Sequence, residues 1–180
     1  MYYIFEQSVQ LNPGGECIWS REGNYTWAET YDRVNQYAQW FLSQGVKQHD
    51  LVSIYLTNSP DFIFAWLGLW AVGAAPTMIN YNLSGKALLH CLKVAGSSLF
   101  LVDDDEALLS RIENDRAEIE KLGQAIHVLD GSLKQKIYGQ PKERPADSCR
   151  DQVKGDWPVA IFYTRYCLRF PDTIPRAYEL

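Results

Sequence analysis

The sequence predicts an α/β protein built from parallel-sheet βαβ units. Short apolar runs rich in β-branched and aromatic residues, such as Leu51–Thr57 and Leu99–Val102, alternate along the chain with segments whose apolar residues recur at helical spacing. A strand, a helix of this length and a second strand form a right-handed βαβ unit. Such units place consecutive strands in a parallel sheet. Both observations exclude an all-helical bundle and an all-β sandwich.

The first predicted helix has the clearest start signal in the chain. Thr26 and Glu29 form an S/T-x-x-E capping box, and apolar residues then recur at helical spacing until Gly45. The apolar run Leu51–Thr57 predicts a buried strand. Ser59-Pro60 then supplies an N-cap and a first helical residue, so a second helix is expected to run to about Val72.

The segment Phe62–Ile79 has 18 residues without a charge, which is close to the length of a membrane-spanning helix. Gly68, Gly73 and Pro76 interrupt it, and proline cannot continue a helix. The segment therefore predicts a helix of about 12 to 14 residues, a turn and a buried strand over Ala75–Asn80, because Pro76 breaks any longer helix.

The alternation continues towards the carboxyl terminus. Ser84 is expected to cap a helix that Gly96 ends, and the strand Leu99–Val102 follows. A more polar helix is predicted from Ala107 to Leu122, and a short strand from Ala125 to Leu129. The stretch Gly131–Gly155 predicts an exposed connection because it is rich in charges, glycine and proline, and Pro158–Thr164 predicts a strong buried strand.

Composition bounds the function classes. Hydrophobic residues make up 47% of the chain and charged residues 22%, which is ordinary for a globular protein. The net charge is −5 and no basic stripe occurs, so nucleic-acid binding has no electrostatic support. The four cysteines form no CxxC pair, which argues against a zinc site or a disulfide framework and fits a reducing compartment. The first ten residues lack the pattern of a secretory signal.

Few residues present themselves as catalytic or metal-binding candidates. The chain contains neither GxGxxG nor a Walker loop. The acidic run Asp103–Glu106 follows a predicted strand, so it is a candidate Mg²⁺ site, although acids at a helix start also satisfy backbone amides, and we favour that capping role. Adjacent His90 and Cys91 point about 100° apart on a helix. His49 and His127 are interpreted as structural, and four tryptophans as core filling: Trp27, Trp40, Trp66 and Trp70. We therefore predict no catalytic residue and no metal ligand.

Four segments in order resemble the adenylate-forming superfamily. They are NYTWAETY at Asn24–Tyr31, GVKQHDLV at Gly45–Val52, NSPDFIFAWLGLW at Asn58–Trp70 and INYNLSGKALLHC at Ile79–Cys91. The last two are typical of AMP-forming acyl-CoA ligases of the fatty-acid transport and very-long-chain acyl-CoA synthetase branch, and the fungal members are most similar. The resemblance runs from Tyr2 to Thr164 and implies a partial N-terminal subdomain of an adenylate-forming enzyme, residues 1–164.

The resemblance implies an enzyme that activates a fatty acid with ATP and magnesium, releases pyrophosphate and transfers the acyl group to CoA. The implied setting is intracellular, at the peroxisome, endoplasmic reticulum, lipid droplet or plasma membrane. It is compatible with peripheral membrane association. Because the family's sheet is completed by further strands, we also expect an isolated chain to self-associate through an exposed sheet edge.

The chain departs from the family after Thr164. The family continues its IFYT strand into S-G-T-T-G-x-P-K, the loop that holds the ATP phosphates, whereas Arg165–Pro171 follow here and no glycine occurs after Gly155. Thr164 is the one remnant of the ATP-binding loop, and 165–180 are interpreted as a non-homologous tail. We therefore expect an N-terminal fragment that is catalytically inactive as this chain. The alternatives are a non-catalytic α/β acyl-binding or protein-interaction module and an unrelated small doubly wound enzyme.

Overall fold

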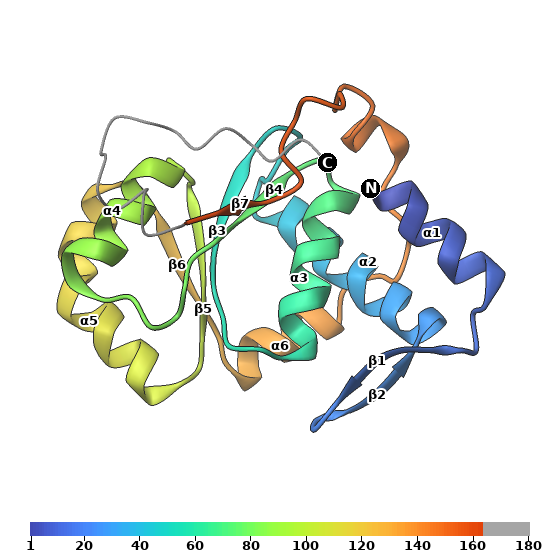
Figure 1. The fold of residues 1–180 in the computed structure, drawn as a ribbon, viewed down its shortest axis with the longest axis horizontal. Coiled ribbons are helices and arrows are strands. Elements are labelled where there is room, and N and C mark those ends of the chain that lie inside the picture. Colours follow the sequence, from blue (N-terminus) through green and yellow to red (C-terminus); the bar gives the residue numbers. More distant parts are fainter. Residues whose placement is uncertain (164–180) are drawn as a thin grey trace. The chain divides into compact units, whose positions relative to one another are not determined.

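A computed structural model describes residues 1–163 of the chain, which fall into two compact units (Figure 1). Unit 1 comprises residues 1–49, 58–74 and 134–153, and unit 2 comprises residues 50–57, 75–133 and the described residues from 154 onward. Each unit is discontinuous in sequence, because the chain passes between them several times.

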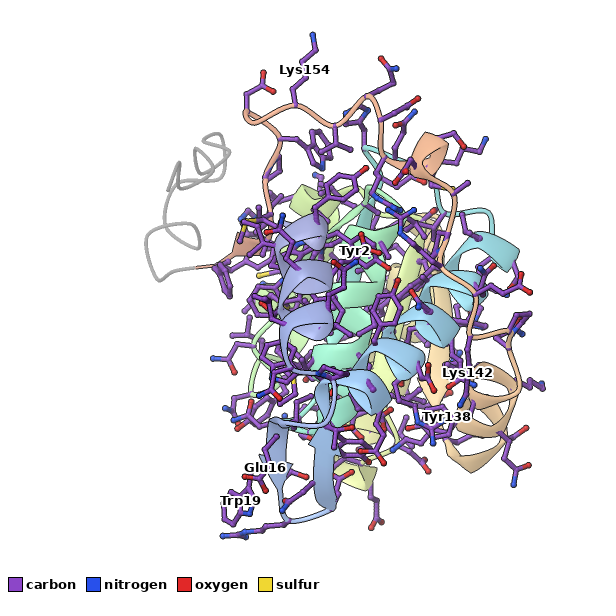
Figure 2. The ribbon with its side chains drawn as sticks, turned by 90° about the vertical axis from the view of Figure 1, so that its right-hand side faces the viewer. Tyr2, Glu16, Trp19, Tyr138, Lys142 and Lys154 are labelled. Atoms are coloured by element: carbon purple, nitrogen blue, oxygen red, sulfur yellow. The ribbon has the colours of Figure 1, made fainter. Side chains whose placement is uncertain are left out.

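Unit 1 contains a hairpin and several helices. Its elements are α1 (Tyr2–Leu11), β1 (Glu16–Ser20), β2 (Gly23–Thr26), α2 (Trp27–Ser43) and α3 (Pro60–Ala71), followed later by most of α6 (Gly131–Tyr138) and by the 3₁₀ helix η1 (Asp147–Cys149). Strands β1 and β2 pair antiparallel. Figure 2 looks onto this part of the chain and shows Tyr2 on α1 and Trp19 on the hairpin.

Helices α2 and α3 of unit 1 start at the predicted caps. The capping box of α2 is present: the Glu29 backbone N–H donates to Thr26 Oγ1 at 3.2 Å, and the Thr26 N–H donates to Glu29 Oε2 at 2.8 Å. Ser59 caps α3, with Pro60 as its first residue. The predictions for both helices are confirmed. Helix α3 packs closely on α2 at Gly68, where an added Cβ would lie 2.9 Å from the Cβ of Tyr37.

The uncharged segment Phe62–Ile79 divides as the sequence predicts. Helix α3 is 12 residues long and ends at Ala71, and β4 (Ala75–Met78) contains Pro76. The predicted turn and buried strand are therefore confirmed. Among residues 1–163, no helix combines the length and apolar character needed to cross a membrane.

Unit 2 is built on a parallel sheet, which confirms the α/β fold class. Its strands are β3 (Leu51–Tyr55), β4, β5 (Leu99–Asp103), β6 (Ala125–Leu129) and β7 (Ile161–Phe162), and their spatial order is β6-β5-β3-β4-β7. All four neighbouring pairs are parallel. Two helices connect strands of the sheet within the unit: α4 (Gly85–Ala95) and α5 (Glu106–Lys121).

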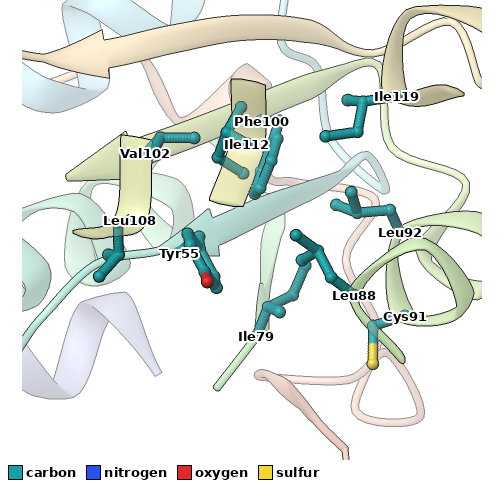
Figure 3. Packing of buried hydrophobic residues seen from close by; sticks show 10 residues of the cluster. All are labelled: Tyr55, Ile79, Leu88, Cys91, Leu92, Phe100, Val102, Leu108, Ile112 and Ile119. Carbon is teal, nitrogen blue, oxygen red and sulfur yellow. The ribbon is translucent and has the colours of Figure 1, made fainter. Parts of the chain in front are cut away.

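Apolar side chains of α4 and α5 pack on the sheet to form the core of unit 2 (Figure 3). The cluster contains Tyr55, Ile79, Leu88, Cys91, Leu92, Phe100, Val102, Leu108, Ile112 and Ile119. Helix α4 ends at Gly96, which adopts φ +59°, as predicted. Its start differs in one detail: Ser84 stands at the N-cap position without a side-chain capping bond, and the Gly85 N–H donates instead to Asp115 Oδ2 at 2.9 Å.

The predicted exposed connection over Gly131–Gly155 is wrong in two places. Residues 131–138 form α6, whose Tyr138 hydroxyl donates to Asp61 Oδ1 at 2.6 Å. Arg150 is only 6% exposed, and its Nη1 donates to the backbone oxygen of Ala71 at 2.6 Å. Helix α6 and Arg150 are both held by hydrogen bonds to residues of α3, which precede them by more than 60 positions in the chain. The composition of the segment contains no sign of them.

The predicted strong buried strand over Pro158–Thr164 is also wrong in extent. Strand β7 has two residues, Ile161 and Phe162, and the Phe162 side chain is 49% exposed. The reason is its place in the sheet: within residues 1–163, β7 lies at the edge and pairs with β4 alone.

The tryptophans also differ from their interpretation as core filling. Trp40 is buried, whereas Trp27, Trp66 and Trp70 are half-buried. Trp66 and Trp70 pack edge to face, with ring centroids 5.6 Å apart. The interpretation as core filling is therefore confirmed for Trp40. The other three tryptophans are less buried than that interpretation requires.

Candidate functional site

The carboxyl ends of the parallel strands in unit 2 form the candidate site. Because β3, β4, β5 and β7 run in the same direction, the residues that follow them meet at one edge of the sheet. Open α/β sheets bind their ligands outside this edge. Thr164, the predicted remnant of the ATP loop, comes two residues after the end of β7 and lies outside the described residues.

Two of the strand ends are tied together at this edge. The backbone N–H of Thr57, after β3, donates to Asp103 Oδ2 at 2.9 Å, and the Thr57 hydroxyl donates to the same oxygen. Asp103 is the last residue of β5. The carboxylate thus satisfies a loop amide and holds the neighbouring strand ends in register, which gives the edge a fixed geometry.

The acidic run Asp103–Glu106 acts mainly through hydrogen bonds to the protein. Asp105 Oδ1 accepts from the backbone N–H groups of Ala107 at 2.9 Å and Leu108 at 3.1 Å. Asp105 is therefore the N-cap of α5, and the predicted capping role is confirmed for it. In the part of the chain that the structure describes, no group of three or more His, Cys, Asp or Glu side chains is placed to hold a metal ion.

The loop between β4 and α4 is anchored at the same edge. The Tyr55 hydroxyl donates to the backbone oxygen of Leu83 at 2.6 Å, and Arg111 Nη1 donates to the backbone oxygen of Tyr81. Burial raises the pKa of Tyr55, while nearby Arg111 opposes that rise, so the phenol stays protonated as a donor. Sequence reasoning missed Tyr55 and Arg111 as anchors, because each lies about 30 residues from the loop segment it holds.

The remaining candidates lie on α4, on β6 and in a turn. Cys91 is fully buried in the core of unit 2, and His90 is half-buried beside it on α4. His127 lies in β6, where burial lowers its pKa below the usual value. His49 belongs to unit 1 and occupies a turn with φ +67°. His49 and His127, which the sequence analysis interprets as structural, thus lie in a turn and in a strand.

Hydrogen bonds fix the framework of this edge. Two strand ends are joined, the loop after β4 is anchored, and the start of α5 is capped. The described residues supply this scaffold. In the enzymes that this chain resembles, the motifs that act on a bound nucleotide come after the position that corresponds to Tyr163.

Comparison with known proteins agrees with this architecture. The family model described as AMP-binding enzyme matches residues 5–164. Isopenicillin N epimerase component 1 of Hapsidospora chrysogena is 36% identical over 151 residues, which cover 83% of this chain and 24% of that protein. The very long-chain fatty acid transport protein of Cochliobolus heterostrophus is 28% identical over 165 residues, or 91% of this chain and 25% of that protein.

A solved structure shows the same fold. The fatty acyl CoA synthetase of Mycobacterium tuberculosis superposes with a TM-score of 0.78 at 19% identity, over 92% of this chain and 32% of that chain. The chain thus spans about a quarter of the length of the two curated relatives and about a third of that structure.

Proposed function

Because this chain belongs to the AMP-binding enzyme family, we propose that residues 1–164 serve as the amino-terminal α/β portion of an ATP-dependent fatty-acid or very-long-chain acyl-CoA ligase that acts in fatty acid activation and uptake. The fatty acid is inferred from relatives named as fatty acid transport proteins. The family assignment also favours an intracellular setting, since ATP and CoA are intracellular substrates.

The pairing of β7 with β4 carries the proposal. Ile161 and Phe162 pair in parallel with Thr77 and Met78, so the chain leaves β7 at the carboxyl edge of the sheet. In the resembling enzymes the loop that holds the ATP phosphates begins at this point. The residue after β7 therefore starts from the carboxyl edge of the sheet, where a phosphate-binding loop would contact its ligand.

The residues that follow do not fit ATP. Arg165 replaces the first residue of the family's loop, and no glycine occurs after Gly155, whereas a phosphate cradle needs consecutive backbone amides in conformations that glycine favours. Asp103, the acid at the edge, already accepts two bonds from Thr57. We accordingly propose a scaffold role for residues 1–164 and treat 165–180 as a tail outside the family's pattern.

The purified 180-residue chain is expected to form no acyl-adenylate, because it lacks the phosphate loop. The measurement is ATP–pyrophosphate exchange that depends on added fatty acid, with heat-killed protein as the control. Exchange above that control would contradict the proposed inactivity.

The scaffold role has a separate test that can succeed. Two chimeras of the Cochliobolus heterostrophus transport protein are compared: one takes residues 1–164 and keeps that protein's own following sequence, and the other takes 1–180 in place of the aligned residues. The first is expected to retain fatty-acid-dependent exchange and the second to lose it. If the first chimera is folded, as judged by circular dichroism, but shows no exchange, the proposed scaffold role is wrong. Activity in both would show that the tail does not disrupt the loop.

We also propose that the isolated chain self-associates through the edge of its sheet. Phe162 is 49% exposed on β7, which pairs with β4 alone within the described residues, and an exposed apolar edge strand favours association. Light scattering at micromolar concentration should show species larger than a monomer, and Phe162→Lys should reduce them. A monodisperse monomer with a sharp melt would instead favour the alternative, a self-sufficient, non-catalytic acyl-binding or interaction module.

A further inference from the structure

The loop between β4 and α4, residues 80–84, is held from outside through two of its backbone oxygens. The oxygen of Tyr81 accepts a hydrogen bond from Arg111 Nη1. The oxygen of Leu83 accepts one from the Tyr55 hydroxyl at 2.6 Å. Tyr55 is the last residue of β3, and Arg111 lies on α5. A strand and a helix that are distant in sequence therefore fix the position of this loop.

The loop packs on the same apolar surface as the residue that follows β7. Tyr81, Leu83 and Tyr163 are all partly buried against the core cluster of unit 2. Figure 3 shows Tyr55 and Ile79 among the residues of that cluster. Strand β7 pairs with β4, so the chain leaves these two strands at neighbouring positions, about 4.8 Å apart. The position of Tyr163 thus depends on a surface that the anchored loop helps to form.

We propose that Arg111 and Tyr55 are positioning residues for ATP, an inference that rests on the proposed function. Their action is indirect: they hold the loop, the loop completes the surface under Tyr163, and Tyr163 precedes the point at which the family's phosphate loop starts. With both anchors present, this surface is formed before ATP binds. Without them it is formed for only part of the time, and the apparent affinity for ATP falls by that fraction.

The test is the kinetics of ATP–pyrophosphate exchange by the first chimera, which carries residues 1–164 of this chain before an intact phosphate loop. Arg111→Met keeps the apolar stem and removes the donor. It is expected to raise the KM for ATP about tenfold, the factor for an anchored state that falls to about a tenth of the population. The kcat, and the KM for fatty acid at saturating ATP, should stay the same. Arg111→Lys keeps a donor and should restore most of the affinity, and Tyr55→Phe should raise the KM for ATP as well.

Gln124→Met is the matched control. Gln124 is buried in unit 2, and its Nε2 donates to the backbone oxygen of Leu92 at 2.9 Å, so it also holds a backbone oxygen. It precedes β6 and therefore lies at the amino edge of the sheet, opposite the candidate site. Gln124→Met should lower the melting temperature without changing the KM for ATP. An unchanged KM in Arg111→Met, or an equal rise in Gln124→Met, overturns the proposal.

Hydrogen exchange in the 180-residue chain adds a measurement that needs no activity. Arg111→Met is expected to speed amide exchange about tenfold both in residues 80–85 and in residues 161–163, because the loop and the end of β7 loosen together. Gln124→Met should speed neither. Faster exchange in the loop alone would show that the anchors do not act on Tyr163, and the proposal would be wrong. If the unmutated chimera has no activity, the proposed function itself fails, whereas an active chimera with equal KM values refutes this inference alone.

Discussion

Asp61→Ala is expected to lower the free energy of unfolding of unit 1 by about 3 kcal/mol, because it leaves buried donors without their acceptor. The Asp61 side chain is 4% exposed. Its Oδ1 accepts from the hydroxyls of Tyr37 at 2.7 Å and Tyr138 at 2.6 Å, and its Oδ2 lies 2.8 Å from Lys134 Nζ. One carboxylate on α3 therefore connects α2 and α6.

The buried phenol of Tyr37 makes the loss costly. Burial, with Asp61 beside it, raises the pKa of Tyr37 well above its usual value, so the hydroxyl remains a donor at any ordinary pH. Without Asp61 that donor has neither its acceptor nor ready access to water. Tyr37→Phe removes the donor instead and should cost less, about 1 kcal/mol.

Asp32 provides a matched control for Asp61. It also pairs with a lysine in unit 1, with Lys142 Nζ 2.7 Å from Asp32 Oδ2, but the two side chains are 61% and 41% exposed. Exposed ion pairs contribute about 0.5 kcal/mol, so Asp32→Ala should be nearly neutral. Urea unfolding followed by far-UV circular dichroism measures both variants. Losses within 1 kcal/mol of each other, on the scale expected for exposed pairs, would show that burial at Asp61 does not have the assigned effect.

Gly73→Ala is expected to destabilise unit 1 by about 3 kcal/mol, through backbone strain and overpacking together. Gly73 follows α3 with φ +75°, a conformation that costs other residues about 1 kcal/mol or more. An added Cβ would also lie 2.6 Å from the backbone oxygen of Cys149 and 3.0 Å from the Cα of Arg150. These are backbone atoms, which cannot move aside as a flexible side chain can.

Gly45 separates the two contributions. It follows α2 in the same unit with φ +82°, and an added Cβ there would meet nothing within 4 Å. Gly45→Ala therefore reports the backbone strain alone and should cost about 1 kcal/mol. The difference between the variants, again from urea unfolding, measures the contact between residue 73 and the segment around Cys149. Equal losses would mean that this segment does not lie against Gly73.

The sequence predicted the elements that have local signals. The capping box at Thr26 and Glu29, the Ser59-Pro60 start and the glycine stop at Gly96 each act within one helical turn, and the structure has a helix start or end at each of them. The same holds for the break at Pro76, because a proline restricts its own residue and its immediate neighbours. Helix α1 was not predicted, because no capping side chain marks its start: Met1 stands at the N-cap position and makes no side-chain capping bond.

The candidate site was predicted only in part. The acidic run at the end of a strand indicated the carboxyl edge of the sheet as a candidate, and the cap at Asp105 followed from local chemistry. The link between Thr57 and Asp103 and the anchors at Tyr55 and Arg111 were not predicted. Each joins residues about 30 to 46 positions apart, and a polar or aromatic side chain in isolation gives no sign of which distant group it will meet.

By itself, the sequence determined the α/β class, the parallel direction of the strands and the family, because each depends on short segments whose spacing and order are written along the chain. Only the tertiary structure decided that the strands lie in the order β6-β5-β3-β4-β7, that Asp61 accepts from both α2 and α6, and that Gly73 lies against Cys149. These features are contacts between distant residues. They depend on how whole elements pack, and packing is governed by shape and burial in three dimensions, which local periodicity does not specify.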